Sequence, residues 1–305
     1  MTVPRILLLG KSGQVGSALQ VRLAGRGETF APDRDACDLA NVDQLRDVIR
    51  GVQPNIIINA AAYTAVDRAE DDADICFRAN AIAPGVIAEE AESLGARLIH
   101  YSTDYVFDGA KEAAYLEEDM PSPLNVYGRA KLAGDRAISA ATDNHTIVRV
   151  GWVYGLAGHN FAKTILRLAA ERDELRIVDD QVGAPTSAEF IAEVTTRIVD
   201  CWARDAGPNA GKEARGVFNL APSGRVSWHS YAVELIREAK RHGWSLRIEE
   251  DRIIPIASEQ YRTAAARPKN SLLDTRKIRQ AFDLDIPAWQ VHLKQFIAEL
   301  GAHAR

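Results

Sequence analysis

The sequence contains few cysteines and no long apolar run. Its 305 residues include only Cys37, Cys76 and Cys201, and no two of them form a C-x-x-C pair. An odd number of cysteines without paired spacing predicts reduced thiols rather than a disulfide framework. The first apolar run, residues 6–9, is too short to span a membrane, and no leader-like cleavage site follows it. We therefore expect a cytoplasmic protein with no membrane partner.

An excess of positive charge is also absent. The formal net charge is -5, which gives no reason to expect nucleic acid or an acidic membrane as a partner. His100, His145 and His159 lack the spacing of metal ligands. These histidines are expected to be structural, and the sequence predicts no metal site.

Short apolar runs alternate with helical patterns through the first 150 residues. Runs that are apolar throughout are typical of parallel strands covered by helices on both faces. The alternation therefore predicts an α/β protein with a doubly wound parallel sheet. The predicted strands are 5–9, 55–58, 97–101 and 146–150, and the predicted helices between them are 42–50, 75–94 and 127–140.

A glycine-rich turn, Gly10-x-x-Gly13-x-x-Gly16, follows the first predicted strand and opens a helical pattern. Glycine permits a sharp turn and a close approach of the backbone to a pyrophosphate, while the helix N-terminus offers free N–H groups to the anion. The strand–turn–helix context therefore predicts a Rossmann-type dinucleotide site. The spacing resembles that of the extended short-chain dehydrogenases.

Two charged residues after the expected second strand bear on the choice of cofactor. Asp33 lies near the position where an acid accepts hydrogen bonds from the adenosine ribose, and Arg34 beside it is suited to a 2′-phosphate. Because both charges are present, the sequence predicts use of both NADH and NADPH. Asp38 and Leu39 are candidates for contacts with adenine, although each also fits a solvated turn.

The second half of the chain is less regular. We expect residues 1–150 to form the dinucleotide-binding domain, with return segments near 185–201 and 216–220. Residues 151–305 would then form most of a smaller substrate domain, and the site would lie in the cleft between the two. Predicted helices are 161–171, 188–202, 230–241 and 289–300, predicted strands are 175–178, 216–220 and 246–249, and 203–214 reads as an exposed loop.

Tyr127 and Lys131 stand four residues apart on a helical pattern, which places both side chains on one face. An ammonium beside a tyrosine favours the phenolate and lowers the tyrosine pKa from about 10. Such a tyrosine can exchange a proton with a sugar oxygen. An ordinary surface pair is the alternative, and the glycine turn upstream disfavours it.

Hydroxyl residues follow the predicted strand 97–101. In doubly wound sheets, ligands bind beyond the carboxyl ends of the strands, where the run 102–107 would lie. A hydroxyl here is expected to donate to the same carbonyl oxygen that Tyr127 protonates. The alternative is a turn capped by serine or threonine.

Taken together, these motifs resemble the dTDP-4-dehydrorhamnose reductase family. The combination of S-T-D-Y-V-F, S-P-L-N-V-Y-G and D-Q-x-G-A-P-T is more specific than the Tyr/Lys pair. The resemblance implies reduction of dTDP-4-dehydro-β-L-rhamnose to dTDP-β-L-rhamnose by NADPH or NADH, with hydride delivered to C4. It covers nearly the whole chain, through residues 10–16, 59–67, 102–107, 122–128, 152–154, 160–163, 180–186 and 267–271.

The resemblance also implies roles for matching residues. Thr103, Tyr127 and Lys131 would be catalytic: Tyr127 protonates the C4 oxygen, Lys131 holds the nicotinamide ribose and lowers the Tyr127 pKa, and Thr103 hydrogen bonds the substrate oxygen. Asp104 and Trp152 match substrate contacts. Some family members dimerise around a divalent metal such as Mg²⁺ held by glutamates, but the sequence does not place such ligands. The implied cofactor contacts are Gly10, Ser12, Gly13, Gln14, Val15, Gly16, Asp33, Asp38, Leu39, Ala62, Tyr63, Thr64, Tyr127 and Lys131.

Several alternatives stay open at this point. Another nucleotide-sugar epimerase or dehydratase would share the fold, but a dehydratase needs a pair of carboxylates, and only one acid, Asp104, follows Thr103. A non-catalytic nucleotide-binding subunit would be favoured by loss of the tyrosine or the lysine, and both are present. Trp152 also fits the core, and Arg267 fits either a diphosphate contact or a surface ion pair. The short segment between Asp33 and Asp38 departs from the family pattern, so the adenosine-end contacts are the least secure.

Overall fold

The computed structural model describes residues 3–204 and 214–303. Its centre is a six-stranded sheet in the order β10-β5-β4-β3-β1-β2, and every neighbouring pair is parallel. The predicted doubly wound parallel sheet is confirmed. Because β2 and β3 lie on opposite sides of β1, the topological switch point falls beside the carboxyl end of β1. The strands are β1 (Arg5–Leu9), β2 (Glu28–Phe30), β3 (Ile56–Asn59), β4 (Arg97–Thr103), β5 (His145–Val150) and β10 (Gly216–Asn219).

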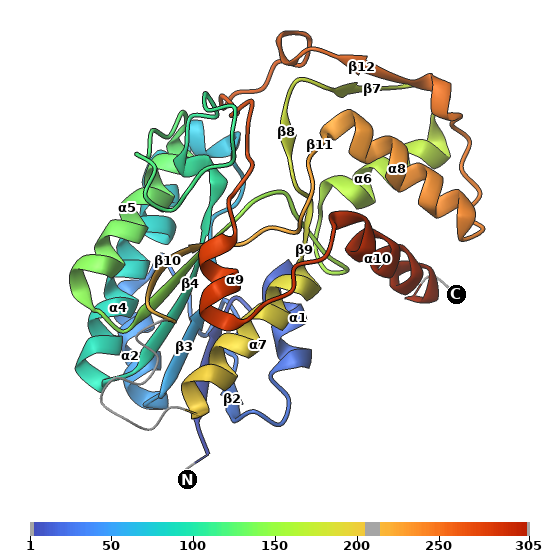
Figure 1. Ribbon diagram of the computed structural model, residues 1–305. Coiled ribbons are helices and arrows are strands. Elements are labelled where there is room, and N and C mark those ends of the chain that lie inside the picture. Colours follow the sequence, from blue (N-terminus) through green and yellow to red (C-terminus); the bar gives the residue numbers. More distant parts are fainter. Residues whose placement is uncertain (1–2, 205–213, 304–305) are drawn as a thin grey trace.

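Alternate residues of each strand enter two separate cores. Ile6 and Leu8 of β1 pack toward α1 (Gln14–Arg22), α7 (Ala188–Arg204) and α9 (Arg276–Phe282). Leu7 and Leu9 pack on the other face, toward α2 (Val42–Val52), α4 (Ala83–Leu94) and α5 (Val126–Ala141) (Figure 1). Since side chains alternate between the faces of a strand, apolar residues are needed at every position.

The predicted helix 75–94 is interrupted in the structure. It divides into α3 (Ala73–Phe77), a π-helical segment η2 (Arg78–Ile82) and α4. Pro84 has no N–H to continue the regular hydrogen bonds, so the backbone is free to widen just before it. The buried Asn80 of η2 bonds both backbone groups of Tyr63, to the N–H at 2.9 Å and to the carbonyl at 2.8 Å. The interruption therefore fixes the loop that follows β3.

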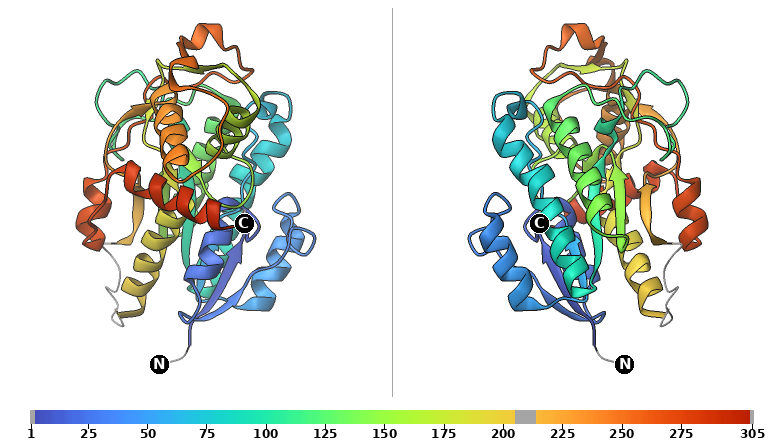
Figure 2. Two further views of the ribbon diagram at one scale, coloured as in Figure 1. Left: turned by 90° about the vertical axis from the view of Figure 1, so that its right-hand side faces the viewer. Right: turned by 90° about the vertical axis from the view of Figure 1, so that its left-hand side faces the viewer.

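A further apolar core, separate from the two that cover the faces of the sheet, lies beyond the sheet. It is formed by α6 (Phe161–Glu171), α8 (Trp228–Arg241) and α10 (Trp289–His303), with the parallel pair β7 (Leu175–Val178) and β12 (Ile253–Ile256). Both side views show the orange segment that carries α8 and β12 above the blue N-terminal segment (Figure 2). The remaining short strands are β6 (Val153–Tyr154), β8 (Val182–Gly183), β9 (Thr186–Ser187) and β11 (Val226–Ser227), and the 3-10 helices are η1 (Arg68–Glu70), η3 (Asp104–Val106), η5 (Glu250–Arg252) and η6 (Ser258–Gln260).

One predicted strand, 246–249, is wrong. The N–H groups of Arg247 and Ile248 both bond to the Ala169 carbonyl at the end of α6, so this segment is tied to a helix end instead of to a sheet. The strand forms later, as β12. Of the predicted loop 203–214, residues 203–204 belong to α7 and 205–213 lie outside the described residues. The division into two domains stays a prediction, although β10 pairs with β5 inside the large sheet.

Candidate active site

The glycine turn between β1 and α1 leaves no room for side chains at two positions. Gly10 has a φ of +83°, and a Cβ there would lie 2.6 Å from the Ala61 nitrogen. A Cβ on Gly16 would lie 2.0 Å from the Gly10 carbonyl oxygen. Gly13 is the N-cap of α1 and donates its N–H to that same oxygen at 3.0 Å. The turn thus presents bare backbone and a helix N-terminus, an arrangement that fits a pyrophosphate.

The other predicted residues of this turn have different surroundings. Ser12 is exposed, and Val15 packs against the core beneath α1. Gln14 accepts a hydrogen bond from the Asn160 side chain at 2.9 Å. Because Asn160 is the N-cap of α6, this bond joins the glycine turn to the core formed by α6, α8 and α10.

Where the adenosine of the cofactor is expected to bind, the cation beside Asp33 is not the predicted Arg34. Lys11, inside the glycine motif, lies 3.0 Å from the exposed carboxylate of Asp33, and sequence reasoning missed it in favour of Arg34. Asp38 accepts the Ala40 N–H at 3.0 Å in a local turn. Leu39 is buried with the core residues of α2 and α4. The acid predicted to face the ribose therefore carries a lysine beside it.

The loop after β3 lies against the glycine turn, because Ala61 meets Gly10 there. Tyr63 is held at its backbone by Asn80, and its hydroxyl donates to Asp72 at 3.1 Å. Ala62 and Thr64, on either side, are exposed. The three predicted cofactor residues of this loop thus lie at the same sheet edge as the turn.

Thr103, Asp104 and Tyr127 come together at the carboxyl end of β4. Thr103 Oγ1 donates to Asp104 Oδ1 at 2.9 Å and accepts the Tyr105 N–H at 3.1 Å, and Thr103 is near enough to Tyr127 to act on its pKa. Tyr127 stands in the first turn of α5, whose N-cap, Asn125, accepts the Gly128 N–H at 2.7 Å. The structure therefore brings the predicted hydroxyl, the neighbouring carboxyl and the predicted phenol to one place.

The surroundings of Tyr127 raise its pKa. Burial is the main cause, and the nearby Asp104 carboxylate adds to it. Lys131 is only 2% exposed, and its Nζ contacts the Tyr101 carbonyl at 2.6 Å and His100 Nε2 at 3.0 Å. A lowered Tyr127 pKa, the direction predicted from the sequence, is thus the opposite of what this arrangement gives.

Asp104 is buried at the centre of the cluster. Burial raises its pKa to about 6, while hydrogen bonds with Ser271 and Thr103 act in the opposite direction. Gly151 makes room for the carboxyl group, because a Cβ there would lie 2.9 Å from Asp104 Cγ. This side chain therefore changes its charge closer to neutral pH than an exposed aspartate does.

Trp152 has a backbone conformation that is rare for its residue type. Its φ is +50°, in the left-handed region that disfavours bulky side chains. Its ring stacks on Trp228 with a centroid distance of 3.5 Å and an interplanar angle of 9°, and Gly183 leaves space beside it. Strained backbone of this kind clusters at functional sites. Trp228 begins α8 and belongs to no motif, so sequence reasoning missed it.

Arg267 forms an ion pair, one of its two predicted alternatives, but close to the site. Its guanidinium binds both oxygens of Asp67, at 2.9 and 2.7 Å, and its positive charge acts to lower the pKa of the nearby Tyr105. The Tyr105 ring meets the Tyr127 ring edge-on at 5.8 Å. The Tyr105 ring thus lies near both Arg267 and Tyr127, the predicted general acid.

The described residues contain neither a cluster of metal ligands nor a membrane-spanning helix. Across residues 3–204 and 214–303, no group of three or more His, Cys, Asp and Glu side chains could hold a metal ion. No helix within the same ranges is long and apolar enough to cross a membrane.

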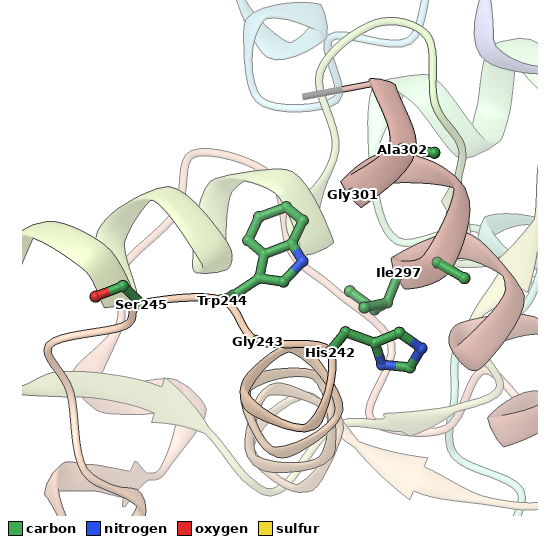
Figure 3. A pocket seen from close by; sticks show the side chains of 8 residues that line it. His242, Gly243, Trp244, Ser245, Ile297, Gly301 and Ala302 are labelled. Atoms are coloured by element: carbon green, nitrogen blue, oxygen red, sulfur yellow. The ribbon is translucent and has the colours of Figure 1, made fainter. Parts of the chain in front are cut away.

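A cavity of about 670 Å³ lies between the end of α8 and the end of α10. Figure 3 shows Trp244, Ile297 and His242 among the side chains around it. None of the predicted site residues lines it. Its lining residues are His242, Gly243, Trp244, Ser245, Ile297, Ala298, Gly301 and Ala302.

The fold and the site define an extended short-chain dehydrogenase/reductase. A doubly wound sheet carries a G-x-x-G-x-x-G turn at its switch point and a Tyr-x-x-x-Lys helix that follows β4 in the chain. The chain matches the family described as RmlD substrate binding domain over residues 4–302. It is 43% identical over 299 residues, 97% of each chain, to the dTDP-4-dehydrorhamnose reductase of Shigella flexneri. The protein belongs to the dTDP-4-dehydrorhamnose reductase family, as its motifs predicted.

Other relatives agree with this assignment. The dTDP-4-dehydrorhamnose reductase of Escherichia coli K12 is 42% identical over 299 residues, again 97% of each chain. The crystal structure of the Bacillus anthracis enzyme, in complex with NADP, superposes with a TM-score of 0.89 at 31% identity, covering 98% of this chain and 100% of that one. The Clostridium acetobutylicum ortholog gives 0.88 at 34% identity, covering 97% and 99%.

Proposed function

We propose that the protein reduces dTDP-4-dehydro-β-L-rhamnose to dTDP-β-L-rhamnose with NADPH or NADH. The observation that carries the proposal is the convergence of Thr103, Asp104 and Tyr127 at the carboxyl end of β4. It lies at the same sheet edge as the glycine turn, where this fold binds its ligands. The relatives named for this reaction match along 97% of the chain, which supports the same substrate.

The glycine turn fits a dinucleotide because side chains are excluded where the pyrophosphate would approach. When bound, the cofactor supplies the hydride that reduces C4. Asp33, Asp38, Leu39 and Lys11 would hold its adenosine end, and Lys131 with Tyr127 its nicotinamide end. Gly10, Ser12, Gly13, Gln14, Val15, Gly16, Ala62, Tyr63 and Thr64 complete the proposed contacts.

Tyr127 is the proposed general acid. Because its pKa is raised, the phenol keeps its proton until negative charge develops on the C4 oxygen. Thr103 would donate its O–H to that oxygen in place of Asp104 Oδ1, which accepts it in the structure. The stacked rings of Trp152 and Trp228 form a flat surface against which a sugar can pack.

Two rivals are less well supported. An epimerase or dehydratase would share the sheet and the glycine turn, but elimination calls for a second acid beside Asp104, where Tyr105 stands instead. A regulatory subunit has no need of Thr103, Asp104 and Tyr127 gathered at one strand end. We also propose a cytoplasmic location, a possible homodimer, and a division in which residues 1–150, with 185–201 and 216–220, bind the cofactor.

The decisive experiment mixes the purified protein with the keto sugar and NADPH, or NADH, and follows the nicotinamide absorbance. We expect stoichiometric oxidation of the cofactor and a product whose NMR spectrum is that of dTDP-β-L-rhamnose. Tyr127→Phe is the matched control. A new sugar without cofactor oxidation would show an epimerase, and no change at all would show a binding protein.

A further inference from the structure

A buried hydrogen-bonded chain runs from the loop after β3 to Lys131. The Ala61 N–H donates to Asn59 Oδ1 at 3.2 Å, and Asn59 Nδ2 lies 3.1 Å from His100 Nδ1. His100 Nε2 lies 3.0 Å from Lys131 Nζ. Asn59 and His100 are each 1% exposed, so water does not complete these bonds.

The chain has a defined polarity. Because Asn59 Oδ1 accepts from Ala61, the Asn59 NH₂ group faces His100 and donates to Nδ1. A neutral imidazole carries one proton, so that proton is on Nε2. Nε2–H then donates to Lys131 Nζ, which accepts only as a neutral amine.

A protonated Lys131 requires the reverse polarity. The ammonium has no lone pair, so it must donate to His100 Nε2, which moves the imidazole proton to Nδ1. Asn59 must then turn its oxygen toward His100 and its NH₂ group toward the Ala61 N–H. Two donors would face each other there, so protonation of Lys131 breaks the Asn59–Ala61 bond.

The charges around Lys131 oppose one another. The Asp135 carboxylate on α5 favours the ammonium form of Lys131. The same carboxylate also lies 3.6 Å from the Arg149 guanidinium of β5 and accepts a hydrogen bond from Ser102 at 2.8 Å. The Cys76 thiol on α3 also faces Lys131, and burial raises the pKa of that thiol. Burial lowers the pKa of Lys131 to about 8. The pKa of His100 is also lowered, mainly by burial and further by the charge of Lys131.

We propose that His100, oriented by Asn59, is a positioning residue that keeps Lys131 balanced between amine and ammonium. This inference rests on the proposed function, in which Lys131 serves Tyr127 and the cofactor. A lysine with this balance can be present as amine or as ammonium in the folded site, because His100 stabilises the amine when the proton is absent.

The test is an NMR titration of the protein labelled with ¹³C at lysine Cε, with the Lys131 signal identified by its loss in Lys131→Arg. We expect Asn59→Asp to raise the Lys131 titration midpoint by more than one pH unit. A carboxylate accepts from both the Ala61 N–H and His100 Nδ1–H, which leaves Nε2 to accept from an ammonium. Asn80→Asp is the control, since it adds the same charge nearby without touching His100.

A second variant keeps the test decisive if Asn59→Asp does not fold. His100→Gln separates Lys131 from Asn59, and the midpoint should rise by about one pH unit because protonation no longer breaks the Ala61 bond. Equal shifts in Asn59→Asp and Asn80→Asp, or no shift in His100→Gln, would overturn the inference. The titration needs no turnover, so its failure is distinct from a failure of the reductase assay.

Discussion

Asp104→Asn should make the protein's stability less sensitive to pH. In the folded chain, burial raises the Asp104 pKa to about 6 from an ordinary 3.8. The folded state therefore binds a proton that the unfolded state has already released between these two values. The stability from protonated Asp104 is fully present below 3.8 and is lost as the pH rises through about 6.

The size of the effect follows from the difference between the two pKa values. A difference of about two units corresponds to a cost of about 3 kcal/mol for ionising Asp104 in the folded protein at pH 8. About half of that cost already applies at pH 5. At this pH the aspartate of the unfolded chain is mostly ionised, whereas Asp104 in the folded chain is mostly protonated. Between pH 5 and pH 8, the wild type should therefore lose about 1.4 kcal/mol that Asp104→Asn keeps.

The assay is urea unfolding of both proteins at pH 5 and at pH 8. Comparing one variant at two pH values cancels any constant cost of burying the new amide. Asp108→Asn is the control, because hydrogen bonds from Ala110 and Tyr115 lower the Asp108 pKa, and its effect on stability should be the same at both pH values. A constant free-energy difference between Asp104→Asn and wild type would show that Asp104 is already ionised below pH 5, which would refute the reasoning.

Three further predictions concern the site. Tyr127→Phe should lower kcat by roughly 10²–10⁴-fold and change the cofactor Kd, measured by fluorescence, far less, because the ring and Lys131 remain; a wild-type rate would exclude Tyr127 as the acid. Trp152→Gly should be about 1 kcal/mol more stable in urea than Trp152→Ala, because only glycine accepts the positive φ freely, and the reverse order would contradict the strain. Both variants should raise the keto-sugar KM more than the cofactor Kd. Lys11→Ala should lower kcat/KM for NADPH roughly five-fold more than for NADH, whereas Arg34→Ala should not; the opposite result would return the role to Arg34.

The sequence by itself determined the class of fold and the chemical groups of the site. Apolar runs such as residues 6–9 specify strands buried on both faces, and glycine is required wherever a Cβ would meet backbone, as at Gly10 and Gly16. Both signals are local, because they depend on side-chain alternation and on the conformation of a single turn. Tyr127 and Lys131 were found for the same reason, since their spacing on one helix is a local property.

Only the tertiary structure decided which groups act on one another. Lys131 contacts His100, which lies 31 positions earlier in the chain. Trp228 stacks on Trp152 although 76 positions separate them, and Lys11 in the β1–α1 turn reaches Asp33, which follows β2. The Tyr127 pKa went the opposite way from the prediction because burial and Asp104 raise it, while Lys131 contacts the Tyr101 carbonyl and His100 instead. Burial and contacts between distant segments depend on how the layers pack, and no spacing in the sequence encodes that packing.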